Sequence, residues 1–456
     1  MKLLKPLLLA LGMLVLAAGC ATEETVIEAP SESTLGDQTY DTSPALNQNV
    51  NPQDTATKVT ISDTLTFSDA LSKALLENPR LQSYGWKVRV KEAERIQASL
   101  LPNPQLNAEM ENFGGTGPFE GYGGREVTVK LGQKILLGAD RLKRKRLAGA
   151  TKELAGWDYE AQRLDVLTGV TKAYISALEA QRQWQQQKEL VDVAQNLYNS
   201  ISAQVKAGKV SKLAQTKAQV ELSRAKIDLE NARNQWESAR SSLAAYWGSE
   251  QPKFKQLKGE LSMPSAIPEY AKVQAYIQRN PDVARWATEL QQRESALDLE
   301  QAKGIPNITV SGGYKRAEDL GASAAIVGVS IPLPFFDRNQ GNIKAAKYEL
   351  SRVQTQREAA VTQTYKALQT AYNRLDAATH EVNQLQEQVL PGAKTAFEAA
   401  QTGYRQGKFD YLEVLDAQRT LFSTRTRYIQ ALAEYNRAVA EVERLIGTPL
   451  SEISAN

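Results

Sequence analysis

Two acidic side chains, Glu413 and Asp416, are the strongest candidates for chemistry in this sequence of 456 residues. In a helix, residues three apart lie on one face, so these carboxylates would lie together and attract cations. A purely structural interpretation is also open. Asp410 and Glu413 have the spacing of a capping box, and acids are favoured at the start of any helix.

The rest of the sequence offers few groups that bind metals or attack substrates. The one histidine, His380, lies within a predicted helix without a Cys or His partner, so we expect it to be packed or solvated. No nucleophile–base arrangement, Gly-rich phosphate loop or zinc motif appears. We therefore predict no enzyme activity, no cofactor and no metal site. Lys+Arg 55 against Asp+Glu 52 leaves the chain nearly neutral, which gives no electrostatic basis for binding nucleic acid.

The N-terminal segment has the features of a secretory signal peptide. Two lysines precede the apolar stretch Leu7–Leu16, and the only cysteine, Cys20, follows in Leu-Ala-Ala-Gly-Cys, which resembles a bacterial lipobox. We expect residues 1–19 to be removed and Cys20 to carry lipid. The alternative is an ordinary signal peptide with an incidental cysteine. Residues 20–60 are polar and predict a flexible, lipid-anchored tether.

After residue 60 the sequence contains an internal repeat. Three dipeptides recur about 200 residues later: Asn78-Pro79 as Asn280-Pro281, Gly208-Lys209 as Gly407-Lys408, and Ala218-Gln219 as Ala417-Gln418. The units of solenoid proteins are much shorter, at roughly 20–50 residues. We therefore predict a duplicated half-molecule, with repeats at 61–260 and 261–456. Each repeat contains a helix, two short strands and two very long helices.

Each repeat contains one candidate β-hairpin, at about residues 104–131 and 306–332. Apolar and polar residues alternate along the strands, which places one face in an apolar medium and the other in water. No run after the first twenty residues approaches the roughly 18 apolar residues of a membrane-spanning helix. Strands of roughly ten residues can cross a bilayer instead. A small soluble sheet is the alternative interpretation.

Four strands are too few to close a barrel, because the smallest membrane barrels have about eight. In lipid, open strand edges cost several kcal/mol for each unpaired backbone group. If these strands span a membrane, copies of the chain must share one wall. Two copies would supply eight strands and three would supply twelve, and the residues alone do not choose between them.

Long helical hairpins are predicted at about residues 139–247 and 340–446, each turning at a glycine. Gly208 and Gly407 would supply the left-handed caps for the two reversals. Apolar residues recur at alternating intervals of three and four, which indicates a heptad seam. In the first repeat this seam comprises Leu222, Ala225, Leu229, Ala232, Trp236, Ala239, Leu243 and Tyr246. A coiled-coil stalk without a pore would show the same pattern.

Taken together, the sequence after residue 60 resembles the TolC-type outer-membrane efflux channels. Asn78-Pro79 resembles the family's opening helix, and two segments resemble its heavy-metal (cobalt–zinc–cadmium) branch. These are Leu101-Pro-Asn-Pro-Gln-Leu106 and Ile331-Pro-Leu-Pro-Phe-Phe-Asp-Arg-Asn-Gln-Gly341. The resemblance implies a homotrimer with a twelve-stranded transmembrane β-barrel and a long periplasmic α-helical barrel. An equatorial domain would form from residues 248–270 and the termini.

The same resemblance implies partners and roles for single residues. A periplasmic adaptor (membrane fusion) protein would join the channel to an inner-membrane pump of the resistance-nodulation-division class. Glu413 and Asp416 match the acidic segment that constricts the periplasmic end, where three copies would form two carboxylate rings. Tyr404 matches a tyrosine that holds the tip closed, although Ala214 replaces its acidic partner. Candidate adaptor contacts, or simple turn residues, are Gly208, Lys209, Gly407, Lys408 and Phe409.

The sequence therefore predicts a passive outer-membrane duct, with divalent heavy-metal cations as the expected solutes. A channel of the same fold for drugs or other organic solutes is one alternative. A lipid-anchored periplasmic coiled-coil scaffold without a pore is another. The amphipathic strands favour a channel, because a scaffold has no use for them.

Overall fold

The computed structural model describes residues 63–263 and 267–454. All of them belong to the second of two compact units, Val59–Asn456. The first repeat contains α2 (Phe67–Glu77), α3 (Pro79–Ser99), β2 (Gln105–Glu111), β3 (Glu126–Ile135), α4 (Asp140–Lys206) and α5 (Lys212–Ala244). The second contains α7 (Pro281–Lys303), β5 (Ile308–Ala317), β6 (Ala322–Ser330), α8 (Gln340–Gln384), α9 (Leu390–Arg405) and α10 (Tyr411–Ile446). The expected fold class, mostly helical with a small β part and internally duplicated, is confirmed.

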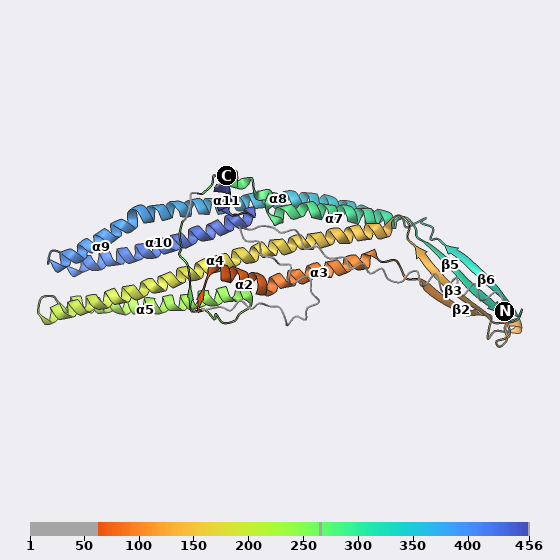
Figure 1. Ribbon diagram of the computed structural model, residues 1–456, viewed down its shortest axis with the longest axis horizontal. Helices are drawn as coiled ribbons and strands as arrows, with labels where there is room; N and C mark the ends of the chain where they lie inside the picture. The colour runs from red at the N-terminus through yellow and green to blue at the C-terminus, as the bar shows by residue number, and fades with distance from the viewer. Residues whose placement is uncertain (1–62, 264–266, 455–456) are drawn as a thin grey trace. The chain divides into compact units, whose positions relative to one another are not determined.

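The two hairpins combine into one four-stranded sheet with the order β2-β3-β5-β6. All three pairings are antiparallel, and the central pair β3–β5 joins the two repeats, from Glu126 opposite Ala317 to Ile135 opposite Ile308. Strands β2 and β6 therefore form the two edges of this sheet. Figure 1 shows the sheet at one end of this unit and the tips of the α4–α5 and α9–α10 hairpins at the other.

The register of the sheet separates most apolar from most polar side chains as the alternation predicts; Gln133 and Arg316 on the apolar face and Ile326 on the polar face are exceptions. Residues paired across the strands share a face. One face contains Leu106, Ala108, Met110, Val127, Val129, Leu131, Ile308, Val310, Tyr314, Val327 and Val329. The other contains Asn107, Glu109, Glu111, Glu126, Thr128, Lys130, Lys134, Thr309, Ser311 and Lys315. Leu106 and Val327, on the apolar face, are 70% and 82% exposed in the single chain, so this face is left uncovered.

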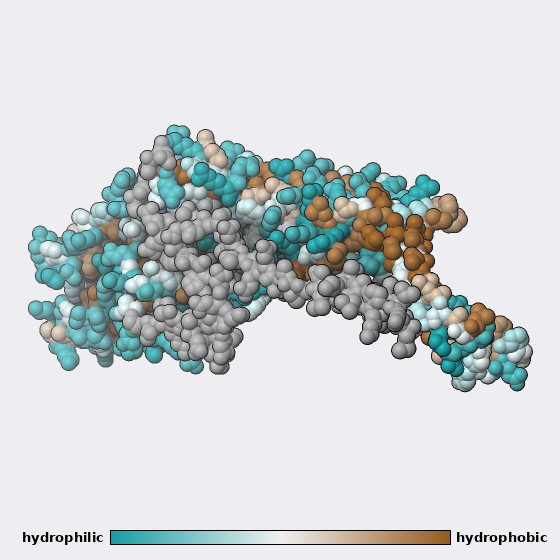
Figure 2. Space-filling model, turned by 45° about the vertical axis from the view of Figure 1, so that its right-hand side comes forward, coloured by the Kyte–Doolittle hydropathy of each residue, from teal (hydrophilic) through white to brown (hydrophobic). Residues whose placement is uncertain are grey.

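Apolar side chains also gather where the helices meet the sheet, as the brown surface in Figure 2 shows. The segments that connect helices to strands contain several large exposed apolar residues. They are Leu100, Leu101, Ile305, Leu333, Phe335 and Phe336. Phe336 is 93% exposed, so this surface, like the apolar face of the sheet, has no covering within the described chain.

The long helices follow the predicted heptad seam. Helix α4 has 67 residues and packs against α5, and Leu222, Trp236 and Leu243 on the α5 seam are buried. Helix α10 buries its seam too, but it also buries a second set of side chains, including Phe422 and Ala433. The second set exists because α10 contacts α4 of the other repeat as well as α8 and α9 of its own. Among residues 63–263 and 267–454, no helix is both long and apolar enough to cross a membrane.

The second hairpin differs from the expected unbroken helices at one place. A π-helical turn, Leu385–Val389, separates α8 from α9, and Pro391 is the second residue of α9. Proline has no N–H to donate, and its ring would clash with the carbonyl group four residues earlier. A widened turn relieves that clash without breaking the helical path.

A group of short elements, called the equatorial belt below, packs against the middle of the long helices. Strand β1 (Thr64–Leu65) pairs in parallel with β4 (Gln256–Leu257), and the Tyr174 hydroxyl of α4 donates to the Leu65 and Lys258 carbonyl groups. Helices α6 (Tyr270–Gln274) and α11 (Leu450–Ser454) form the corresponding part of the second repeat. Each repeat has its own apolar core here, one around Trp236 and Phe254, the other around Leu375 and Ile446.

Three ion pairs connect the two repeats along the contact between α4 and α10. They are Asp165 with Arg444, Lys172 with Glu441, and Glu179 with Arg437. The α4 members are seven residues apart and alternate in sign, and the α10 members alternate in the opposite sense. A shift of one pair would bring like charges together, so the series disfavours other registers between the repeats.

The repeated Asn-Pro pairs have the same structural role in both halves. The side-chain oxygens of Asn78 and Asn280 cap α3 and α7, accepting from the backbone N–H groups of Leu81 at 2.8 Å and Asp282 at 2.7 Å. Their amide N–H groups donate to carbonyl groups near the end of the last long helix of the same repeat. Each asparagine thus satisfies two helix ends at once.

The Asn280→Ala variant should therefore lower the free energy of unfolding by about 2–4 kcal/mol, through loss of the cap and of the bonds to two carbonyl groups. Asn231→Ala is the control, because Asn280 is fully buried whereas Asn231 is exposed on α5. It should change the free energy of unfolding by less than about 0.5 kcal/mol. Denaturant unfolding of the purified chain measures both. Equal effects of the two substitutions would contradict this role of Asn280.

Candidate functional site at the tips of the helical hairpins

Both helical hairpins turn in the same way. Gly208 and Gly407 have φ of 73° and 72°, a left-handed conformation that glycine adopts without steric cost. The N–H groups of Lys209 and Lys408 donate back to carbonyl groups five residues earlier, at 2.9 and 2.8 Å. This is a Schellman turn, repeated in each half. Both glycines and both lysines are exposed, so the backbone fixes the turns and leaves the lysine side chains in solvent.

The tip of the first hairpin packs against the start of α10. A small apolar cluster joins Ile201 of α4 and Ala218 of α5 to Tyr411 and Leu415 of α10. Burial in this cluster raises the pKa of the Tyr411 hydroxyl to about 12. Within one chain, apolar packing therefore holds the two hairpins together near their tips.

Tyr404 contributes to the same cluster with a different partner from the one the resemblance implies. Its hydroxyl donates to the side-chain oxygen of Gln204 at 3.2 Å, which connects α9 to α4. Ala214, where the resemblance expects an acid, packs against this cluster too. The sequence pointed to Tyr404 but not to Gln204, because only the folded chain brings residues 200 positions apart into contact.

The acidic pair points away from this cluster. Asp410 caps α10, accepting from the backbone N–H groups of Leu412 at 2.6 Å and Glu413 at 3.3 Å. In a complete capping box the Glu413 carboxylate would also accept from the Asp410 backbone N–H. That bond is not among the hydrogen bonds of the described chain. Glu413 and Asp416 are exposed, and neither forms an ion pair with another described residue. Their carboxylates are therefore free to meet solvent, a solute or a second copy.

Phe409 lies beside its own turn. Its ring occupies the space next to Gly403, where a Cβ would come within 2.2 Å of the ring. The ring is 44% exposed. Phe409 and the neighbouring Lys408 thus form an apolar and charged surface at the end of the second hairpin.

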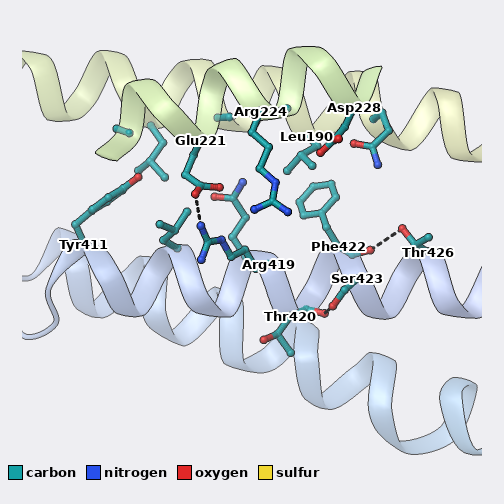
Figure 3. Close-up of a pocket in the computed structure, with 17 residues that line it drawn as sticks. Leu190, Glu221, Arg224, Asp228, Tyr411, Arg419, Thr420, Phe422, Ser423 and Thr426 are labelled. Carbon is teal, nitrogen blue, oxygen red and sulfur yellow. Dashed lines mark hydrogen bonds and ion pairs between the residues drawn. The ribbon is translucent and has the colours of Figure 1, made fainter. Parts of the chain in front are cut away.

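Above the tip, a pocket of about 430 Å³ lies between α4, α5 and α10. Figure 3 shows Glu221 of α5 paired with Arg419 of α10 at one side of it. At the other side, Gln186 of α4 donates to the Phe422 carbonyl at 3.0 Å and to the Thr426 hydroxyl at 2.9 Å. The sequence identified Ala225 as a seam residue but did not predict the pocket or the contacts of Glu221 and Gln186, because their partners lie on the other repeat.

The sequence analysis also considered His380, a metal site and the N-terminal segment. The His380 side chain is 78% exposed, with Asp376 at 3.7 Å. Within residues 63–263 and 267–454, no group of three or more His, Cys, Asp or Glu side chains is arranged to hold a metal ion. Cys20, the signal peptide at 1–19 and the tether at 20–60 lie outside the described residues.

Comparison with known proteins defines the class of protein. A family model for the outer membrane efflux protein matches residues 70–249 and again residues 273–448. The chain belongs to this family, and the two matches correspond to its two repeats. It is an outer-membrane efflux protein with the TolC-type channel fold.

Individual relatives agree with this assignment. The chain is 34% identical over 383 residues to the cobalt-zinc-cadmium resistance protein CzcC of Cupriavidus metallidurans, covering 84% of this chain and 90% of that protein. It is 24% identical to the cation efflux system protein CusC of Escherichia coli K12, covering 82% and 84%. The crystal structure of CusC superposes with a TM-score of 0.70 at 19% identity, covering 84% and 92%. That of the Campylobacter jejuni CmeC outer membrane channel gives 0.71 at 16%, covering 84% and 85%.

Proposed function

We propose that this protein is the outer-membrane channel of a tripartite efflux system and works as a homotrimer. Its solutes are divalent heavy-metal cations, its partners a periplasmic adaptor and a resistance-nodulation-division pump. It catalyses no reaction and needs no cofactor. The channel provides a passive exit, and the pump supplies the energy.

One observation carries this proposal: the amphipathic sheet is uncovered on its apolar face and open at both edges, β2 and β6. Lipid would cover the apolar face. Pairing of β6 from one copy with β2 of the next would satisfy both edges, and three copies would give twelve strands around a water-filled lumen. The exposed apolar side chains between helices and sheet, Phe335 and Phe336 among them, would then lie at the membrane interface.

The assignment of metal cations rests on relatives. Their names specify resistance to cobalt, zinc and cadmium, resistance to nickel and cobalt, and cation efflux.

One relative, SilC of Salmonella typhimurium, is named a probable outer membrane lipoprotein, which supports lipidation of Cys20. Wild type should incorporate a labelled fatty acid, and Cys20→Ser should not. Labelling that persists in Cys20→Ser would contradict this anchor.

A deletion strain tests the function directly. Loss of the gene should lower tolerance to zinc, cobalt or cadmium, and a plasmid copy should restore it, while tolerance to organic drugs should stay unchanged. Growth over a concentration series of each compound measures the effect. A strain that loses drug tolerance and keeps metal tolerance would identify an organic-solute channel instead.

Glu413 and Asp416 are proposed to constrict the periplasmic end, and the tip residues Gly208, Lys209, Gly407, Lys408 and Phe409 to contact the adaptor. Around a threefold axis the free carboxylates would form two rings, which attract cations and repel one another when the tips close. Tyr404, through Gln204, would hold the two hairpins of one chain together at this end.

The double variant Glu413→Ala, Asp416→Ala should therefore raise single-channel conductance and lower cation selectivity, because it removes the six carboxylates that would constrict the end of a trimer. Planar-bilayer recordings of the purified protein measure both quantities. Glu230→Ala, which removes an exposed acid on α5, is the matched control and should behave as wild type. Unchanged conductance and selectivity in the double variant would remove the gate assignment.

A further inference from the structure

The pocket between α4, α5 and α10 is formed by both repeats, has a mixed apolar and polar lining and is partly open to solvent. Leu190, Ala225, Leu415 and Phe422 contribute apolar surface, and Figure 3 shows the Phe422 ring between the helices. Its volume of about 430 Å³ is within the range of small-molecule sites. The adaptor-contact residues proposed above lie at the turns and do not line it.

An unsatisfied polar group lies inside this pocket. Gln418 is only 4% exposed, and its side-chain oxygen has no hydrogen-bond partner. The side-chain oxygen of Gln187, from α4, is also buried without a partner and lines the same pocket. An unpaired buried amide oxygen destabilises the fold, so a donor bound in the pocket that both residues line would satisfy groups that the described chain leaves unpaired.

The duplication supplies an internal comparison. Gln219 is the counterpart of Gln418 in the first repeat, but it is exposed and donates to Ser223. In α10, Gln418 lies instead on the stripe that buries Tyr411, Leu415 and Phe422, where an apolar residue would pack better. The burial of a glutamine is therefore particular to the second repeat and to this pocket.

The charges around the pocket indicate what kind of molecule fits. Glu221 is paired with Arg419, and Arg224 and Asp228 add one charge of each sign, so the formal charges of the lining sum to zero. This balance favours a neutral ligand over a free ion. A carboxamide on an apolar body matches this lining. Its N–H groups can donate to the two glutamine oxygens, its carbonyl oxygen can accept from the Arg224 guanidinium, and its body can contact the apolar residues.

We propose that this pocket binds a small neutral molecule with an apolar body and a carboxamide-like head. Its N–H groups donate to the Gln418 and Gln187 oxygens, its carbonyl oxygen accepts from Arg224, and its body packs against Leu190 and Phe422. The ligand would bridge the two repeats just above their tips. The existence of this site does not depend on the identity of the transported solute.

A fluorine NMR titration of the full-length protein in detergent with para-fluorobenzamide tests the proposal. Wild type should show saturable binding, and Gln418→Leu should weaken it at least fivefold, while Gln219→Leu should leave it unchanged. The isosteric para-fluorobenzoate, which has no N–H groups and is charged, should not compete. Gln187→Leu serves as a second variant, and thermal unfolding should show that Gln418→Leu is at least as stable as wild type.

Two results would overturn the site. One is the lack of saturable binding to wild type up to the solubility limit, which is expected if water or a neighbouring copy fills the pocket. The other is equal affinity in wild type, Gln418→Leu and Gln187→Leu, which would show that the probe binds elsewhere.

Discussion

Backbone hydrogen bonding at the two edges of the sheet is the constraint on which this structure depends. Four strands pair with one another, and β2 and β6 each present an open edge. Water can satisfy such an edge in a soluble protein, but lipid cannot. The apolar face of the same sheet has no covering within the described chain. An apolar face and open edges are compatible in a membrane only if another copy supplies the missing strands.

The long helices place this sheet far from the hairpin tips and connect the two regions. Helix α4, with 67 residues, runs from β3 through the equatorial belt to the tip of its hairpin. Three alternating ion pairs hold it in register with α10, and the apolar cluster around Leu415 holds the tips together. A relative movement of the two repeats would therefore act on the acidic pair at the start of α10 and on the pocket above it.

Much of the fold could be predicted from the sequence, because its signals are local. Alternation identified the four strands and their faces, and heptad spacing identified the buried residues of α5, such as Leu222 and Trp236. The joining of the hairpins through β3 and β5 was not visible, since it pairs segments about 180 residues apart. The second buried face of α10 depends on the other repeat and was missed for the same reason.

The candidate site was only partly accessible to sequence reasoning. The turns at Gly208 and Gly407 follow from glycine chemistry, and the positions of Glu413 and Asp416 on one exposed face follow from their spacing. The partner of Tyr404 could not be predicted, because Gln204 comes from the other repeat. Gln418 gave one weak signal, a polar residue on an otherwise apolar stripe, but its burial without a partner needs three helices in place.

Cross-linking of the two sheet edges tests the central claim most directly. Within one chain β2 and β6 are three strand spacings apart, roughly 14 Å, too far for a disulfide. A cysteine at Asn107 of β2, combined in turn with a cysteine at each of Ala322, Ala324 and Gly328 of β6, should therefore cross-link only between copies. We predict that one combination yields covalent species of up to three chains in native membranes. Single chains only, or a series that ends at two chains, would contradict the account.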